Sequence, residues 1–131
     1  MSKTIISTPD APAAVGTYSQ AVRVGDTLYI SGQLGLDPQT GELKDGFSAQ
    51  ARQAFDNLAA IAQAAGASLA DVVKFNVSMT DLADFAVLND IFAERLNAPY
   101  PARAAVQVAA LPKGGVVEIE AIVYLSLSLI H

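Results

Sequence analysis

The sequence predicts a single α+β domain in which two helices cover one face of a sheet. Two segments with helical spacing are each followed by a segment that alternates like a strand, and the remaining apolar runs are short and separated by turns. The expected order is therefore β-β-β-α-β-α-β-β. Only 16% of the 131 residues are charged, against about 25% in an average domain. Because the other sheet face also carries apolar residues, we expect a homo-oligomer that covers it.

The first third of the chain predicts three strands. Residues 3–6 form a short first strand, and residues 21–24 and 27–31 form a hairpin around a tight turn. Gly32 is expected to end the second hairpin strand, where the missing Cβ lets a ligand or another backbone come close. The turn-rich segment Asp37-Pro-Gln-Thr-Gly41 is expected to be a loop.

The middle of the chain predicts two helices with a strand between them. Residues 48–65 have apolar side chains at helical spacing, and Gly66 ends the pattern. A second helix is expected from a cap at Thr80-Asp81 to about Leu96. Its apolar stripe consists of Phe85, Leu88, Ile91 and Phe92. Four alternating residues of the strand over 72–79 should share one face: Val73, Phe75, Val77 and Met79.

The last part of the chain predicts two strands joined by the turn Pro112-Lys-Gly-Gly115. Arg103 lies on the first of these strands, and Glu118 and Glu120 share one face of the second. If the two strands pair as a hairpin, one register places the arginine and both glutamates on the same side. Such charges in an apolar sheet are costly to desolvate unless they pair with an opposite charge or take part in binding or catalysis. This hairpin is therefore the first candidate for chemistry.

Composition excludes several classes of site. The net charge is −5 without a cluster of Lys or Arg, which argues against nucleic acid and anionic membrane surfaces. No apolar run reaches the ~18 residues of a membrane span, and the first residues lack the pattern of a secretory signal, so a cytoplasmic protein is expected. There is no cysteine, and the only histidine is His131. A Ser-His-Asp triad and a multi-histidine metal site are thus excluded, which leaves carboxylate, tyrosine, lysine or water for proton transfer.

Several segments form one combined pattern over about residues 3–124. They are Gly16-Thr-Tyr-Ser-Gln-Ala21, Tyr29-Ile-Ser-Gly-Gln33, Asp37-Pro-Gln-Thr-Gly41, Asp81-Leu-Ala-Asp-Phe85 with Asn89, Pro101-Ala-Arg-Ala-Ala-Val106 with Leu111, and Val117-Glu-Ile-Glu120. This pattern resembles the Rid (YjgF) family of reactive-intermediate, or enamine/imine, deaminases.

The resemblance implies a chorismate-mutase-like fold and a homotrimer with sites in the clefts between neighbouring subunits. It also implies hydrolysis of 2-iminobutanoate and 2-iminopropanoate to 2-oxo acids and ammonia, without a metal or cofactor. Such imines are released by pyridoxal-phosphate enzymes such as threonine and serine dehydratases. Two other hypotheses remain open: a module that binds a small carboxylate without turnover, and the RNA-cleaving or chaperone-like role attributed to some family members.

The resemblance assigns roles to particular residues. Arg103 is expected to bind the substrate carboxylate through parallel hydrogen bonds; the alternative is a structural ion pair with a glutamate. Glu118 is expected to orient the hydrolytic water and handle its proton, with Glu120 as the competing candidate. Tyr18 is expected to donate a hydrogen bond near the substrate, although a loop tyrosine more often only packs.

The remaining expected contacts are weaker signals. Ser31 and Gly32 match a strand end that touches the ligand, or are an ordinary strand terminus. Asn89 matches a contact residue, or is a polar helix residue satisfied locally. Ala105 stands where many members have cysteine or serine, and this difference leaves the substrate preference open. We expect one domain over residues 1–131, with 125–131 as an atypical extension. It is either a strand in which Leu125, Leu127 and Leu129 share a face, or an exposed tail.

A second departure from the family pattern is Thr17, which stands where the family often has proline. Proline would restrict the backbone of the loop before Tyr18, so threonine leaves that loop less restrained.

Overall fold

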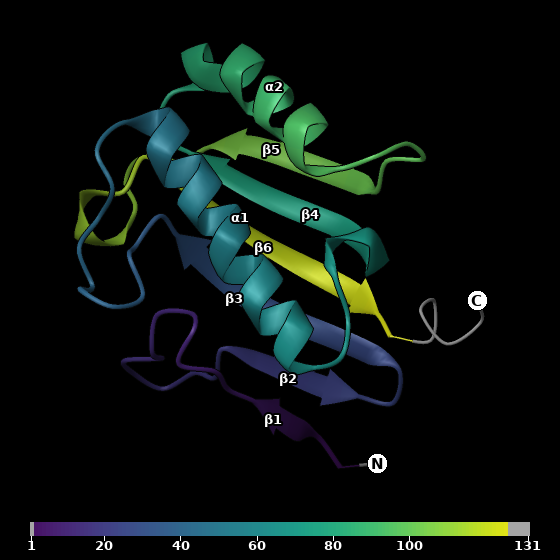
Figure 1. Ribbon diagram of the computed structural model, residues 1–131. Coiled ribbons are helices and arrows are strands. Elements are labelled where there is room, and N and C mark those ends of the chain that lie inside the picture. The colour runs from purple at the N-terminus through teal and green to yellow at the C-terminus, as the bar shows by residue number, and fades with distance from the viewer. Residues whose placement is uncertain (1, 126–131) are drawn as a thin grey trace.

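The computed structural model describes residues 2–125, which form one six-stranded sheet and two α-helices (Figure 1). The predicted element order is confirmed. The strands are β1 (Thr4–Ile6), β2 (Ala21–Val24), β3 (Thr27–Leu34), β4 (Val72–Met79), β5 (Ala102–Gln107) and β6 (Val117–Tyr124); the helices are α1 (Phe47–Ala64) and α2 (Phe85–Arg95), with short 3-10 helices η1 (Leu69–Asp71), η2 (Leu82–Asp84) and η3 (Pro112–Gly114).

Both α-helices lie on the same face of the sheet, as expected (Figure 1). The core fills the space between the helices and this face, and its centre is a trio of aromatic rings. Phe55 of α1, Phe75 of β4 and Phe92 of α2 meet edge to face, with ring centroids 5.0 to 5.6 Å apart. This geometry suits the ring quadrupoles, so the trio fixes both helices against the sheet.

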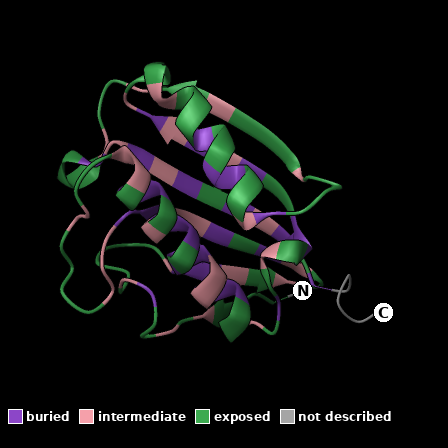
Figure 2. Ribbon diagram, turned by 45° about the horizontal axis from the view of Figure 1, so that its top comes forward, coloured by how far each residue is buried: buried purple, intermediate pink, exposed green. Residues whose placement is uncertain are grey.

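The opposite face of the sheet is open and partly apolar. Ile5, Val22, Tyr29 and Ile122 form one row across four strands, because each is the Cα partner of the next. Ile5 and Tyr29 are each 51% exposed, and buried and exposed positions alternate along the strands (Figure 2). A contiguous exposed apolar surface of this kind is typical of an interaction surface.

The predicted hairpin between the last two strands is wrong. The strand order is β1-β2-β3-β6-β4-β5, so β4 lies between β5 and β6. β5 pairs with β4 in parallel, and β6 pairs with β4 antiparallel. The segment around the expected turn instead crosses the end of β4, where Val108 N–H donates to Met79 O at 2.8 Å and Thr80 N–H donates to Val116 O at 3.1 Å. β4 therefore has a partner on each side, and alternate residues in its second half are buried.

Three boundary details also differ from expectation. β3 does not end at Gly32 but continues to Leu34, with a register shift against β6 between Ile30 and Gln33. A second register shift in β4 buries Val72 and leaves Val73 exposed, because an extra residue reverses the alternation. Asp81 caps η2, and α2 begins only at Phe85.

The structure describes only the first residue of the extension that was expected over residues 125–131. Leu125 is buried, and its N–H donates to Asp26 O at 2.7 Å. The rest of the expected extension, with Leu127 and Leu129, lies outside the described residues. Within residues 2–125, neither α-helix is long and apolar enough to cross a membrane.

Candidate functional site

Arg103 lies on the sheet face that the helices cover. It is the Cα partner of the buried Phe75 on β4, and its guanidinium is directed to α2. Its Cζ atom lies 4.9 Å from the ring centroid of Phe92 and 5.2 Å from that of Phe85. Nη1 donates a hydrogen bond to Asn89 Oδ1 at 2.8 Å. Arg103 and Asn89 also line a pocket of about 440 Å³, together with Phe92, Ala93, Tyr100 and Pro101.

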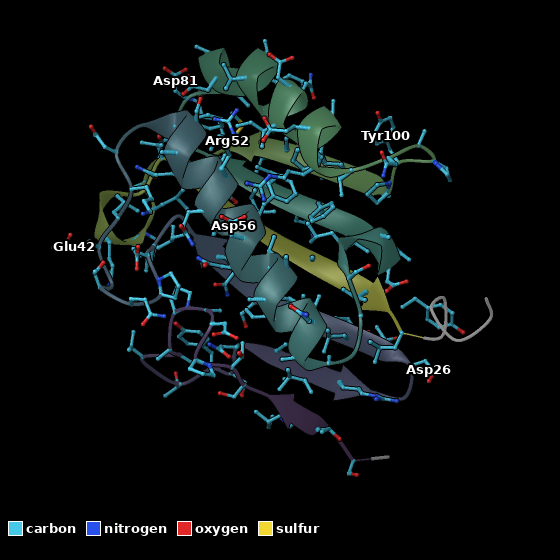
Figure 3. The ribbon with its side chains drawn as sticks, viewed as in Figure 1. Asp26, Glu42, Arg52, Asp56, Asp81 and Tyr100 are labelled. Carbon is cyan, nitrogen blue, oxygen red and sulfur yellow. The ribbon has the colours of Figure 1, made fainter. Side chains whose placement is uncertain are left out.

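Among residues 2–125, Arg103 is the one arginine without a carboxylate partner. Arg23 faces Asp26, and two arginines join the helices: the exposed Arg52 of α1 pairs with Glu94, and the half-buried Arg95 of α2 pairs with Asp56. Arg52 and Asp56 extend from α1 (Figure 3). The structural ion pair considered for Arg103, with Glu118 or Glu120, is not present within the chain. Its guanidinium is therefore available to an external carboxylate.

Glu118 lies on the opposite, open face of the sheet. Its neighbours Val117 and Ile119 on β6 are buried under the helices, so the alternation of the strand directs Glu118 away from them. Its Cα partner on β4 is Ser78, three residues from the partner of Arg103. The expectation that Arg103 and the glutamates share a face is therefore wrong. The structure does not bring Arg103 and Glu118 together within one chain.

Gly32 makes room for the Glu118 side chain. A Cβ atom at position 32 would lie 2.8 Å from Glu118 Cδ, closer than real Cβ atoms come to a carbon. The missing Cβ thus admits the side chain of Glu118, where the sequence suggested a ligand or a backbone. Burial raises the pKa of Glu118, and the nearby charge of Glu120 raises it further. Glu120 is exposed and accepts a hydrogen bond from Asn76 Nδ2 at 3.1 Å.

Glu118 lines a large pocket that collects most of the other expected residues. The pocket measures about 760 Å³. Tyr18 is 52% exposed, and its hydroxyl accepts a weak hydrogen bond from Val15 N–H at 3.4 Å. Ser31 Oγ donates to Ser19 O at 2.6 Å, so this hydroxyl proton already has an acceptor. The predicted residues on this pocket are Tyr18, Ser31, Gly32, Glu118 and the competing Glu120, whereas Asn89 and Arg103 line the smaller one.

One residue that shapes the large pocket was missed in the sequence. Gln20 is buried, and its amide holds the preceding loop: Oε1 accepts from Thr8 N–H at 2.7 Å, and Nε2 donates to Thr8 O at 3.0 Å and to Pro12 O at 2.8 Å. Pro12 lines the pocket, so these bonds fix part of its wall. A glutamine before an apolar strand gives no sign of such burial, and only its place in the family pattern could have indicated it.

Another loop that lines this pocket is ordered by Asp37. Its Oδ1 accepts from the backbone N–H groups of Gln39 and Thr40 at 2.8 and 3.2 Å, and its Oδ2 pairs with Lys44 Nζ at 3.2 Å. The two backbone hydrogen bonds, with a smaller contribution from Lys44, hold the pKa of Asp37 below its ordinary value. This carboxylate therefore serves the loop and is not a free acid.

Comparisons with known proteins give a consistent result. The family model described as endoribonuclease L-PSP matches residues 8–125. The 2-iminobutanoate/2-iminopropanoate deaminase of Bos taurus is 55% identical over 90% of this chain and 87% of its own. The solved structure of RidA from the Antarctic bacterium Psychrobacter sp. PAMC 21119 has 72% identity and a TM-score of 0.91, over 92% of this chain and 98% of its own.

A second solved structure, that of E. coli TdcF with bound serine, is 45% identical with a TM-score of 0.86, over 92% of this chain and 98% of its own. The mixed fold of two helices on a six-stranded sheet agrees with these structures, and the family model covers nearly all described residues. The chain therefore belongs to the endoribonuclease L-PSP family, the Rid (YjgF) family that its sequence resembles.

Proposed function

We propose that the protein hydrolyses short 2-imino and 2-enamino acids, such as 2-iminobutanoate and 2-iminopropanoate, to 2-oxo acids and ammonia. The observation that carries this proposal is that the chain offers two complementary groups. Arg103 offers a guanidinium without a carboxylate partner, and Glu118 offers a carboxyl group whose pKa is raised. The names of relatives at 50 to 55% identity support the same substrates.

The site is proposed to form between subunits of a homotrimer with a chorismate-mutase-like architecture. Arg103 and Glu118 belong to separate pockets on opposite faces of one sheet. A molecule as short as an imino acid reaches both groups only when a neighbouring chain brings its own Arg103 to the Glu118 pocket. The exposed apolar row through Tyr29 on the open face gives a neighbour the surface it would cover.

The proposed chemistry uses the chain's own side chains. Arg103 binds the substrate carboxylate, which fixes the C2 carbon at the Glu118 pocket. Glu118 accepts a proton from water as the water oxygen bonds to C2, and the pair of electrons of the C=N bond moves to nitrogen. Glu118 then returns this proton to nitrogen, which gives a carbinolamine with one hydroxyl and one amino group. In a second transfer Glu118 takes the hydroxyl proton and passes it to the amino group, as the C=O bond forms, the C–N bond breaks and ammonia leaves. Burial raises the pKa of Glu118 above its ordinary value, which makes its carboxylate a better proton acceptor in both steps.

Three further residues are proposed to assist. Tyr18 is placed to donate a hydrogen bond to the substrate or to the attacking water, because its hydroxyl makes only one weak bond as acceptor. The backbone at Ser31 and Gly32 lines the same pocket and offers contacts to the ligand. The serine bound to the related TdcF structure is itself a 2-amino acid, and it supports a site of this size and charge. We propose that the protein acts beside dehydratases in the cytoplasm.

The other hypotheses have less support. A binding module without turnover would have no use for a half-buried glutamate whose pKa is raised. Cleavage of RNA fits the name of the family, endoribonuclease L-PSP, but the net charge of −5 and the carboxylate partners of the other arginines disfavour binding of a polyanion.

The test couples a threonine dehydratase to this protein and follows 2-oxobutanoate and ammonia. We expect both to form faster than by spontaneous hydrolysis of the imine. Arg103→Ala should abolish the acceleration, and the matched control Arg52→Ala should retain it, because Arg52 is exposed and pairs only with Glu94. Wild-type protein that gives no acceleration would remove the deaminase and leave the binding module.

A further inference from the structure

The side chains around Arg103 come from one face of a single helix. Phe85, Asn89 and Phe92 follow each other at intervals of four and three residues on α2, so they lie in one row along its surface. All three contact the guanidinium: two through their rings at 5.2 and 4.9 Å, and the third through a hydrogen bond of 2.8 Å. One helix face therefore sets the position of this side chain.

These contacts differ in kind from those of the other arginines. Each of the other three in residues 2–125 faces a carboxylate, whereas Arg103 meets two aromatic rings and a neutral amide. Rings and an amide oxygen attract a guanidinium without cancelling its charge. Asn89 occupies one N–H of the five that the group carries, so the remaining donors stay available for a carboxylate. The guanidinium is thus held but not neutralised.

A substitution of Phe85 can test the positioning of Arg103 without disturbing the packing of the core. Phe92 is 7% exposed and belongs to the aromatic trio of the core, so its ring also stabilises the fold. Phe85 is 36% exposed and lies outside that trio. A partly exposed ring against a guanidinium contributes little to the core, but it limits the conformations of a long, flexible side chain.

We propose that Phe85, Phe92 and Asn89 are positioning residues that hold the Arg103 guanidinium ready for the substrate carboxylate. This inference rests on the proposed role of Arg103. Because the side chain is ordered before binding, less conformational entropy is lost when the carboxylate arrives. The three residues therefore govern how tightly the substrate binds and leave the chemical step at Glu118 unaffected.

The test compares Phe85→Leu with the conservative Phe85→Tyr, which keeps the aromatic face. In the dehydratase-coupled assay, loss of an exposed cation–π contact should raise KM roughly two- to fivefold in Phe85→Leu with kcat unchanged, and Phe85→Tyr should behave as wild type. The Arg103 Nε–H resonance gives a readout that is independent of activity. It should be shifted by the ring current in wild type and Phe85→Tyr, and should move toward the value of a free arginine in Phe85→Leu.

The possible outcomes are distinct. Thermal unfolding and the size of the assembly should be alike in all variants. If Arg103→Ala loses activity while Phe85→Leu keeps the wild-type KM and resonance, the positioning role is refuted and the deaminase proposal stands. A fall in kcat in Phe85→Leu without a change in KM also refutes it. If Arg103→Ala retains full activity, the carboxylate-binding role of Arg103 is wrong, and the positioning role is refuted with it.

Discussion

Replacing Gly32 by alanine should displace the Glu118 carboxyl group while the fold remains. The added Cβ would lie 2.8 Å from Glu118 Cδ, whereas carbons prefer a separation of about 3.5–4.0 Å. The carboxyl carbon must therefore move by roughly 1 Å, which is easy for the end of a flexible side chain. A misplacement of about 1 Å of a reacting group can lower a rate by roughly 100-fold. We expect Gly32→Ala to lose up to that factor in kcat, with little change in stability.

The assay is the dehydratase-coupled formation of 2-oxobutanoate, together with thermal unfolding. Gly35→Ala serves as the structural contrast, because a Cβ at position 35 would lie 2.4 Å from the backbone Cα of Gln50, which cannot move aside. Gly35→Ala should destabilise the fold, whereas Gly32→Ala should not. A Gly32→Ala protein with wild-type kcat would refute the reasoning that the position of Glu118 depends on the missing Cβ.

Three further predictions follow from the same contacts. Because burial raises the pKa of Glu118, the folded protein binds this proton more tightly than the unfolded chain, and stability falls as pH rises above the ordinary value of 4.5. In urea unfolding, Glu118→Gln should therefore be more stable than wild type at pH 7 and equally stable below 4.5; equal stability at both would contradict the raised pKa. Asn89→Asp gives Arg103 a carboxylate partner, so KM should rise roughly two- to fivefold, and added salt should reduce the effect; an unchanged KM would argue against a carboxylate at Arg103. Gln20→Ala leaves the backbone of residues 8–12 without its partners, which should lower the free energy of unfolding by roughly 1–3 kcal/mol and expose this loop to proteases; unchanged protection would show that the loop is held by other contacts.

The fold class could be predicted because it rests on local periodicity. The helical spacing before Gly66 and the alternation over 72–79 depend on neighbours in sequence, and both elements formed close to their expected limits. Strand pairing is not local. The turn residues at 112–115 suggested a hairpin, but β4 pairs with both of the last two strands and separates them. The sequences of the last two strands do not by themselves indicate that β4 pairs between them.

The sequence suggested candidate residues for the site, but it did not indicate how they are arranged in space. A period of two assigns Arg103 and Glu118 each to a face of its own strand, but it does not say which face the helices cover. Once β4 lies between the two strands, the arginine faces α2 and the glutamate faces the open side. The roles of Phe85 and Gln20 depend on contacts between distant parts of the chain, which no local pattern records.

The central claim is that Arg103 of one subunit and Glu118 of another complete each site. Arg103→Ala and Glu118→Gln should each be inactive alone. Refolded together from urea in equal amounts, they should recover about a quarter of wild-type activity, because random pairing at a head-to-tail interface brings an intact arginine to an intact glutamate in that share of sites. If the co-refolded mixture forms mixed assemblies but stays as inactive as its parents, the two residues do not meet across subunits and the proposed site is wrong.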